Sequence, residues 1–437
     1  MGAVFRRDGW LRCLLVLGTV LAAGAGWARG ARLSEAAAEP TPRSGLSHLE
    51  KGSGYGLNSK ERMLAALEGR QPDMVPVAPH WWGNYKFEIA GKDYMLDCWT
   101  DGSAMVPVYK AFFERFRPDW FHLSGGYPRM RGRYASREYR GVREGERMYL
   151  VAPDGSRDEI LADGNLASHK GDRRHRDLST PAGVMRAIDE ELDRDRTTTA
   201  DDIIAAGYTD HAAEIVREYG DEVFICVNVG APGILPFGTE HYQESLMALY
   251  DYPEGVKRLA WRRYEAALEW AKAFASVGVH GWLISEDVAG SDTISPRMYE
   301  EMLYPVDCWF FEQVSRLGMV PMVYFCGDVR PLIPLLKDSG VRALLVEDSR
   351  KTFDLDVVRM AKELGGRVCL FGNIDTTELL LTGRPDEVER AVRGQLEAAR
   401  HGPFVVANGS PLAPGTPPEN VAAMIGAARR YGRYPLG

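Results

Sequence analysis

Three features of the sequence predict an α/β fold of the (β/α)₈ TIM-barrel type. Short apolar runs alternate with amphipathic helical patterns from residue 209 to the end of the chain. Most runs end abruptly in polar or small residues, as at Cys326–Asp328 and Gly372–Asp375. About eight such runs occur over about 380 residues, which suits a barrel of eight parallel strands with polar residues lining one shared mouth.

The first part of the chain supplies two strands and two helices of this pattern. Residues 59–67 are helical in pattern and can be capped by Ser59, and residues 75–79 form an apolar run that ends at His80. A helix is expected over 102–116 and a second strand over 119–123.

Residues 131–200 interrupt the alternation. From Arg131 to Ile160 the polarity alternates every second residue between turn signals, which predicts a β-hairpin. Residues 161–200 are charged and rich in Thr and Asp, and a helix with a mobile flank is expected there. The sequence therefore predicts a barrel domain over 58–437 with an insertion at about 131–200.

From residue 209 onward the strand–helix unit repeats regularly. Helices are predicted at 209–219, 253–277, 295–317, 329–338, 355–364, 385–399 and 417–431, and strands at 223–227, 282–285, 319–325, 343–346, 367–371 and 404–407. A doubly wound open sheet is the alternative, but no glycine-rich phosphate-binding turn follows any of these strands.

Composition and charge exclude some classes of function. The chain of 437 residues has a formal charge of −8 and a pI near 5.7, which argues against nucleic acid as a partner. Its six cysteines include no CxxC pair, and four of them lie inside or at the end of apolar runs. Buried reduced thiols of this kind are typical of a reducing compartment.

Residues 1–57 have the pattern of an export leader. Arg6 and Arg7 precede an apolar segment over 14–28, and a Pro-, Ser- and Glu-rich spacer follows. The apolar segment is too short and too rich in Gly and Ala for a membrane span. The alternative is an over-long gene model, with the native protein beginning near Leu57. The alternative predicts a cytoplasmic protein, whereas a true leader predicts export.

The polar residues at the strand ends form the candidate site. They are His80, His122, Asn228, Glu286, Asp287, Cys326, Glu347, Asp348, Asn373, Asp375, Asn408 and Ser410. Each of them can instead cap the following helix or satisfy loop backbone, and Asp328, Asp375 and Ser295 are N-cap candidates.

Adjacent carboxylates at one strand end are the strongest catalytic candidates. Glu286 and Asp287 leave a buried strand in succession, so they point to opposite faces and one of them can enter the barrel. We expect catalysis from Glu286, Asp287 and Asp375, because an inward carboxylate can act as general acid or base.

Substrate binding and metal binding are expected from other strand ends. His80, Trp82, Asn228, Asn373 and Asn408 are predicted to contact substrate, with tryptophan supplying a flat stacking surface. Cys326, His80 and Glu286 are the candidate metal ligands, because zinc favours sulfur and nitrogen donors and also accepts carboxylate.

The sequence resembles the uroporphyrinogen decarboxylase superfamily over roughly residues 58–437. The resemblance rests on an ordered set of short motifs at residues 58–69, 72–77, 294–299, 326–328, 372–375 and 416–421. It implies a (β/α)₈ barrel and one of two chemistries, namely decarboxylation of a porphyrinogen or methyl transfer that depends on a corrinoid.

The chain departs from both branches of that superfamily. The segment whose arginines hold substrate carboxylates in the decarboxylases reads His80 to Tyr85 here, without arginine. The zinc ligands of the methyltransferase branch, His-x-Cys and a later Cys, correspond to Tyr324, Cys326 and Ser410, so one of three remains. Zinc binding would then need His80 or Glu286 as substitute ligands.

Three functions follow, in order of preference. The first is methyl transfer between a corrinoid and a small acceptor, with a corrinoid protein as partner. The second is metal-free decarboxylation of a tetrapyrrole or small acid. The third is a non-catalytic protein that binds a tetrapyrrole or corrinoid.

Overall fold

The computed structural model describes residues 56–81, 84–92, 105–125, 140–161, 167, 178–193, 198–238, 241–349 and 352–436. The predicted leader lies outside these ranges, apart from its last two residues. In the described part of the chain, no helix is long and apolar enough to cross a membrane.

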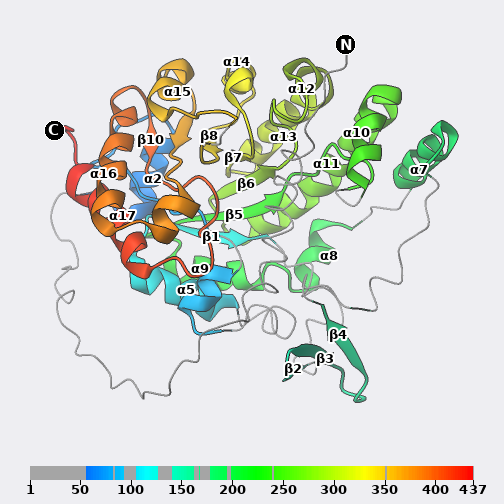
Figure 1. The fold of residues 1–437 in the computed structure, drawn as a ribbon, viewed down its shortest axis with the longest axis horizontal. Coiled ribbons are helices and arrows are strands. Elements are labelled where there is room, and N and C mark those ends of the chain that lie inside the picture. Colours follow the sequence, from blue (N-terminus) through cyan, green and yellow to red (C-terminus); the bar gives the residue numbers. More distant parts are fainter. Residues whose placement is uncertain are drawn as a thin grey trace, which may run out of the picture.

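A seven-stranded parallel sheet forms the centre of the molecule. Its strands, in spatial order, are β1 (Trp120–Ser124), β5 (Phe224–Gly230), β6 (Gly281–Glu286), β7 (Val320–Phe325), β8 (Ala343–Val346), β9 (Cys369–Phe371) and β10 (Phe404–Val405). In Figure 1 these strands follow a curved row with the helices outside it. The strand order follows the chain order, as in a barrel built from successive strand–helix units.

Residues 75–78 close the barrel between its first and last strands. The Ala78 N–H donates to the Val406 carbonyl, and the Val406 N–H donates to the Pro76 carbonyl, both at 2.9 Å. On the other side the Asp119 N–H donates to the Val77 carbonyl at 2.9 Å. The predicted strand at 75–79 is therefore present as a short pairing segment, and the (β/α)₈ prediction is confirmed.

Most predicted helices are present near their predicted ranges, but the one predicted over 295–317 is two helices, and helices at 84–89, 200–205 and 242–251 were not predicted. The helices are α2 (Ser59–Leu67), α3 (Asn84–Ile89), α5 (Met105–Phe116), α7 (Pro181–Asp193), α8 (Ala200–Ala205), α9 (Asp210–Tyr219), α10 (Tyr242–Asp251), α11 (Pro253–Ser276), α12 (Pro296–Met302), α13 (Tyr304–Arg316), α14 (Ile333–Leu336), α15 (Val357–Leu364), α16 (Pro385–Leu396) and α17 (Pro418–Tyr431). The prediction of Ser59 as the cap of α2 is wrong. Asn58 caps this helix by accepting from the Glu61 N–H at 2.8 Å, while the Ser59 hydroxyl donates to Asp119.

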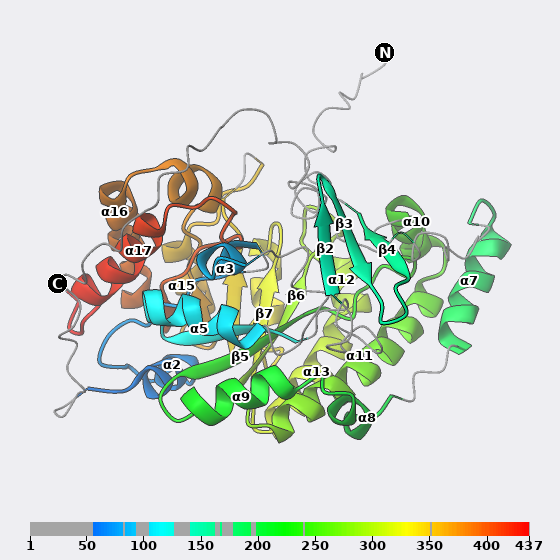
Figure 2. The ribbon, with the colours of Figure 1, turned by 90° about the horizontal axis from the view of Figure 1, so that it is seen from below.

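Part of the predicted insertion forms a separate antiparallel sheet. It consists of β2 (Arg140–Glu144), β3 (Arg147–Val151) and β4 (Arg157–Ile160), in the order β2–β3–β4. Figure 2 shows this sheet toward the upper edge, whereas α2 lies at the lower edge. All three strands lie within residues 131–160, the range over which the sequence predicted a hairpin.

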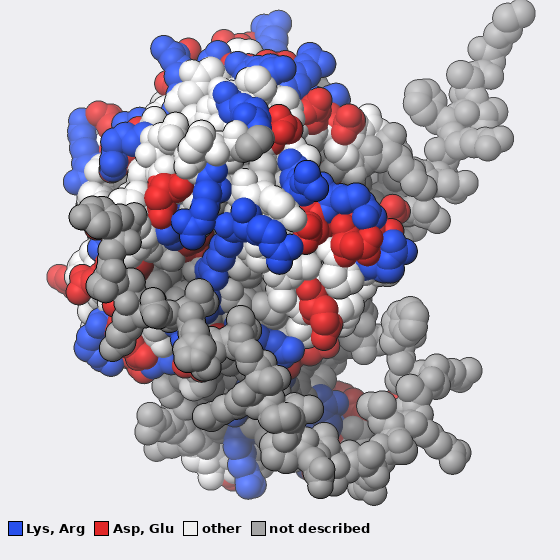
Figure 3. Space-filling model, turned by 90° about the vertical axis from the view of Figure 1, so that its left-hand side faces the viewer, with Lys and Arg blue, Asp and Glu red and all other residues white. Residues whose placement is uncertain are grey.

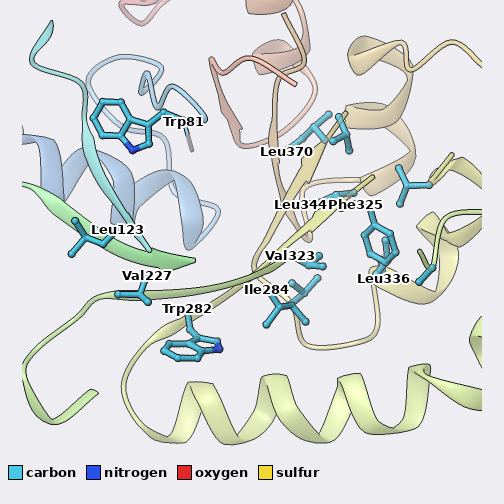
Figure 4. Close-up of a cluster of buried hydrophobic side chains, with 14 of the residues drawn as sticks. Trp81, Leu123, Val227, Trp282, Ile284, Val323, Phe325, Leu336, Leu344 and Leu370 are labelled. Carbon is cyan, nitrogen blue, oxygen red and sulfur yellow. The ribbon is translucent and has the colours of Figure 1, made fainter. Parts of the chain in front are cut away.

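Alternate residues of each strand face two different apolar clusters. Phe224, Leu283 and Met322 face the barrel interior. Trp282 and Ile284 face the surrounding helices, together with residues such as Val323 of β7 (Figure 4). This alternation determines which strand-end side chains can reach the mouth.

The outer surface carries both signs of charge. On the face that Figure 3 shows, lysine and arginine side chains are interspersed with aspartate and glutamate. Arg359 of α15 is ion-paired with Glu363, and Arg390 of α16 is ion-paired with Asp386.

Candidate functional site at the barrel mouth

Two buried histidines line the inner wall below the mouth. His80 follows the closing segment, and its Nδ1–H donates to the Gly409 carbonyl at 3.0 Å. Its ring lies 4.5 Å from the Tyr324 ring and 5.2 Å from the His122 ring, centroid to centroid. Burial lowers the pKa of His80 to about 4, so the imidazole is neutral at pH 7.

His122 is a site residue to which the sequence assigned no role. It lies on β1 with its ring stacked on Trp120, 4.7 Å between centroids. Its Nδ1 accepts from the Trp81 N–H at 3.4 Å, so the proton of the neutral ring is on Nε2. Within the described structure Nε2 has no hydrogen-bond partner, and burial lowers the pKa of His122 well below its ordinary value. The two histidines therefore make an uncharged inner wall.

Asp287 points into the barrel mouth and Glu286 does not. The Cys326 thiol lies 3.4 Å from Asp287 Oδ1 and donates to it, which places both side chains on the inner side. Glu286 lies on the outer side of β6, next to the group formed by Asp307 and two tyrosines. The sequence predicted that two successive carboxylates would diverge, and the structure shows which one enters the barrel.

Burial sets the protonation of the inner pair. It raises the pKa of Asp287 to about 6, and the neighbouring charge of Glu347 acts in the same direction. Burial and the charges of Asp287 and Glu347 raise the pKa of the Cys326 thiol well above its usual range. At pH 7 to 8 the pair is therefore a carboxylate that accepts a hydrogen bond from a neutral thiol.

Glu286 belongs to a buried polar group behind the sheet. Asp307 of α13 accepts from the Tyr264 hydroxyl at 2.6 Å and from the Tyr299 hydroxyl at 2.7 Å. Neither carboxylate oxygen of Glu286 has a hydrogen-bond partner among the described residues. Burial and the nearby Asp307 raise the pKa of Glu286 well above its ordinary value, so this carboxyl group keeps its proton.

Two further acids at the mouth hold loop backbone. Glu347 Oε2 accepts from the Gly327 N–H at 2.8 Å. Asp348 accepts from the Ser410 N–H at 3.0 Å and from the Thr376 N–H at 3.3 Å. A Cβ at Gly409 would lie 2.2 Å from Asp348 Oδ1, so only glycine fits at this position. These contacts fix the loops after β7, β9 and β10 against one another.

The predicted asparagines have different surroundings. Asn228 faces inward and exchanges hydrogen bonds with the Ser285 hydroxyl at 3.1 and 3.3 Å. Asn408 binds backbone on both sides, because its amide accepts from the His80 N–H at 2.9 Å and donates to the His80 carbonyl at 2.7 Å. The Asn373 amide donates to the Leu355 carbonyl at 2.8 Å. Of the three, Asn228 is the one whose side chain bonds to another strand-end side chain of the sheet and not to backbone.

Asp375 forms a helix cap, as the sequence allowed. Its Oδ1 accepts from the Glu378 N–H at 2.6 Å and the Leu379 N–H at 3.0 Å, at the start of a π-helical turn over Thr376–Leu380. Trp82, the remaining predicted contact residue, lies outside the described residues.

The three predicted metal ligands do not converge. Glu286 lies on the opposite face of β6 from Cys326, so His80, Cys326 and Glu286 cannot bind one ion together. Within the described ranges, no group of three His, Cys, Asp or Glu side chains is placed to hold a metal ion. Strand alternation turns Glu286 to the outer face of β6, away from the other two predicted ligands. The described donors do not fit a three-ligand zinc site.

The chain is similar to enzymes of two named kinds. It is 30% identical to the methylcobamide:CoM methyltransferase MtaA of Methanosarcina barkeri over 167 residues, 38% of this chain and 46% of that protein. It is 22% identical to a uroporphyrinogen decarboxylase of Chloroherpeton thalassium over 204 residues, 45% of this chain and 56% of that protein. The matched segments span about half of each relative.

A solved structure has the same fold. A methyltransferase from Methanosarcina mazei superposes with a TM-score of 0.59 at 20% identity, covering 86% of this chain and 99% of that one. The family model described as "Uroporphyrinogen decarboxylase (URO-D)" matches residues 179–431, more than half of the chain. The ordered motifs, the barrel and this match together show that the chain belongs to the uroporphyrinogen decarboxylase (URO-D) family.

Proposed function

We propose that this chain is a methyltransferase that moves a methyl group between a corrinoid and a small acceptor. The observation that carries the proposal is the inward pair of Asp287 and Cys326, 3.4 Å apart at the end of β6 and β7. The similarity to a methylcobamide:CoM methyltransferase supports this class of reaction. The segment from His80 to Tyr85, which contains no arginine, argues against a polyanionic porphyrinogen as substrate.

Asp287 is the proton acceptor in this proposal. A methylated corrinoid supplies a methyl group as a cation equivalent, so an acceptor that carries a proton must release it when its new bond to carbon forms. A carboxylate with a pKa of about 6 is ionised at pH 7 to 8 and is more basic than an ordinary aspartate. Asp287 can therefore take the proton from a thiol, alcohol or amine as the acceptor is methylated.

Cys326 and the histidine wall orient and insulate that carboxylate. The neutral Cys326 thiol donates to Asp287 Oδ1 and leaves Oδ2 for the acceptor. His80 and His122, both neutral, add no charge that would compete for Asp287. No step is assigned to zinc, because the described donors do not form a site for it.

The test is methyl transfer measured with the full chain under anaerobic conditions. Methylcobalamin is incubated with a panel of small thiols, alcohols and amines, and loss of the methyl group is followed by the corrinoid absorbance. We expect demethylation that depends on one class of acceptor and is lost in Asp287→Asn. Cofactor recovered unaltered with every acceptor, at protein concentrations that bind it, would instead favour a binding protein.

A metal-free decarboxylase is the second candidate. One observation favours it: the inward Asp287 carboxylate has a raised pKa, and within the described residues no three metal-ligating side chains converge. Uroporphyrinogen supplied under the same anaerobic conditions separates the two, because coproporphyrinogen would appear only if the chain is a decarboxylase. A chain that demethylates methylcobalamin and leaves uroporphyrinogen intact is a methyltransferase.

A further inference from the structure

A second concave site lies at the opposite end of the barrel from the mouth. It is a depression of about 310 Å³ at the amino-terminal ends of β8, β9 and β10, beside the end of α2. In Figure 2 this end of the barrel is the lower one, where α2 is drawn. The side chains that matter for its chemistry are those of Lys337, Arg342 and Arg367.

The charge of this depression is mostly positive. Arg367 is ion-paired with Asp338 at the rim. Lys337 and Arg342 have no carboxylate partner in the described part of the chain, in contrast to Arg359 and Arg390 on the neighbouring helices. Glu68 also lines the depression, but its carboxylate is bound to Arg70. Two cations that share a concave surface repel each other, and an anion between them removes that repulsion.

The wall of the depression also exposes backbone. Gly69 and Gly366 both have left-handed conformations, with φ of 75° and 77°. A Cβ at Gly69 would lie 3.6 Å from the Gly366 carbonyl, so the two segments approach closely where no side chain intervenes. The wall beside the basic side chains is therefore formed by backbone at these two positions, and a ligand in the depression would contact this backbone on one side.

We propose that this depression binds a small multivalent oxyanion of the phosphate or pyrophosphate type. The Arg342 guanidinium offers two parallel N–H donors to one group of the anion, and the Lys337 ammonium offers a point charge to the same or the next group. A volume of about 310 Å³ accommodates a pyrophosphate and lies at the small end of ligand sites in proteins. The proposal is independent of the reaction at the mouth.

Binding there connects elements that are far apart in the sequence. The end of α2, the residue after α14 and the segments before β8 and β9 all meet at the depression. A ligand that binds only this folded arrangement raises the melting temperature in proportion to the logarithm of its concentration.

The test uses the full chain and sodium pyrophosphate, at an ionic strength held at about 0.15 M with sodium chloride. Isothermal titration calorimetry should show one saturable site, and differential scanning calorimetry a melting temperature that rises with pyrophosphate. Lys337→Gln and Arg342→Gln should each weaken binding by about tenfold or more, because each removes a charge-assisted hydrogen bond. Phosphate at equal charge concentration shows whether one or two anionic groups are needed.

Arg297→Gln is the matched control. It removes the same charge from an exposed arginine on α12, which follows the opposite end of β6, and should leave pyrophosphate binding unchanged. The melting temperatures of all three variants without ligand should match that of the parent protein. The proposal is overturned if pyrophosphate does not saturate up to about 10 mM. Equal weakening by Arg297→Gln would also overturn it, because binding would then depend on net charge alone.

Discussion

Glu286 and Asp287 are neighbours in the chain but belong to different environments. Asp287 faces the mouth, where the Cys326 thiol lies 3.4 Å away, and Glu286 faces the helices beside Asp307, Tyr264 and Tyr299. Burial raises the pKa of both carboxyl groups, but Asp287 is partly exposed whereas Glu286 is buried. A raised pKa by itself therefore does not distinguish a functional acid from a structural one, and position on the strand does.

The largest expected effect is on activity at the inner carboxylate. Asp287→Asn should lower the rate of methyl transfer by about 10²- to 10⁴-fold, the usual contribution of a positioned proton acceptor. Glu286→Gln should change the rate by less than about threefold, because the amide replaces a carboxyl group that is already neutral. Initial rates under saturating methylcobalamin measure both. Equal losses in the two variants would contradict the assignment.

A second comparison concerns Asp307, the buried acid behind the sheet. Asp307→Ala removes the acceptor of two buried tyrosine hydroxyls and should destabilise the protein by about 4 kcal/mol. Asp307→Asn keeps an acceptor oxygen and should cost less. Urea unfolding followed by circular dichroism gives both values. A loss in Asp307→Ala of under about 1 kcal/mol would mean that the two tyrosines find other partners.

The pH dependence of the unfolding free energy shows how much the buried Asp287 carboxylate destabilises the folded chain. Its pKa is about 6 in the folded chain, above the ordinary 3.8 of an aspartate. Its effect on stability is therefore absent near pH 3 and becomes unfavourable as the pH rises to about 6. Asp287→Asn should therefore stabilise the protein at pH 8 by up to about 3 kcal/mol, and at pH 3 by nothing. Unfolding free energies at both pH values check this. If Asp287→Asn lowers activity but does not raise the unfolding free energy at pH 8, the Asp287 carboxylate does not destabilise the folded chain.

The smallest effect is expected at Asp375. Because its carboxylate caps the turn over Thr376–Leu380, Asp375→Ala should cost about 1 kcal/mol of stability. Asp375→Asn retains a capping oxygen and should leave both stability and methyl transfer nearly unchanged. A large loss of activity in Asp375→Asn, with stability intact, would restore the catalytic role that the sequence predicted for it.

The predicted metal ligands can be tested by comparing a variant on the outer face of β6 with a variant at the mouth. If elemental analysis of the anaerobic protein finds a bound metal, Glu286→Gln should leave its content unchanged, because the side chain lies on the outer face of β6. Cys326→Ser should lower the content of any metal held at the mouth. Loss of metal in both variants would mean that Glu286 reaches the mouth after all.

The sequence was sufficient for the barrel and for the position of its mouth. Strand runs such as 343–346 were predicted at their observed bounds, because buried parallel strands are short, apolar and followed by polar residues. Short helices such as α3 were missed, because six residues carry too little periodicity to detect.

The detailed site could not be predicted to the same extent. Strand alternation implied that Glu286 and Asp287 diverge, but the register that places Asp287 inward depends on pairing with β7. The roles of His122 and Tyr324 follow from ring contacts between β1, β7 and the closing segment, which no local pattern encodes. The contact of Asn408 with the backbone of His80, 328 residues earlier in the chain, could not be read from the sequence either.

That last contact has a consequence for how the protein is made. His80 is held by Asn408 and Gly409, so a ribosome-bound chain cannot position this histidine until the strand at Phe404–Val405 has emerged. The closing segment near Val77 therefore lacks its pairing partner at Val406 until over three hundred further residues have been synthesised. Chaperone binding to that early segment, and protease sensitivity of chains stopped before residue 404, are the expected signs of this late closure.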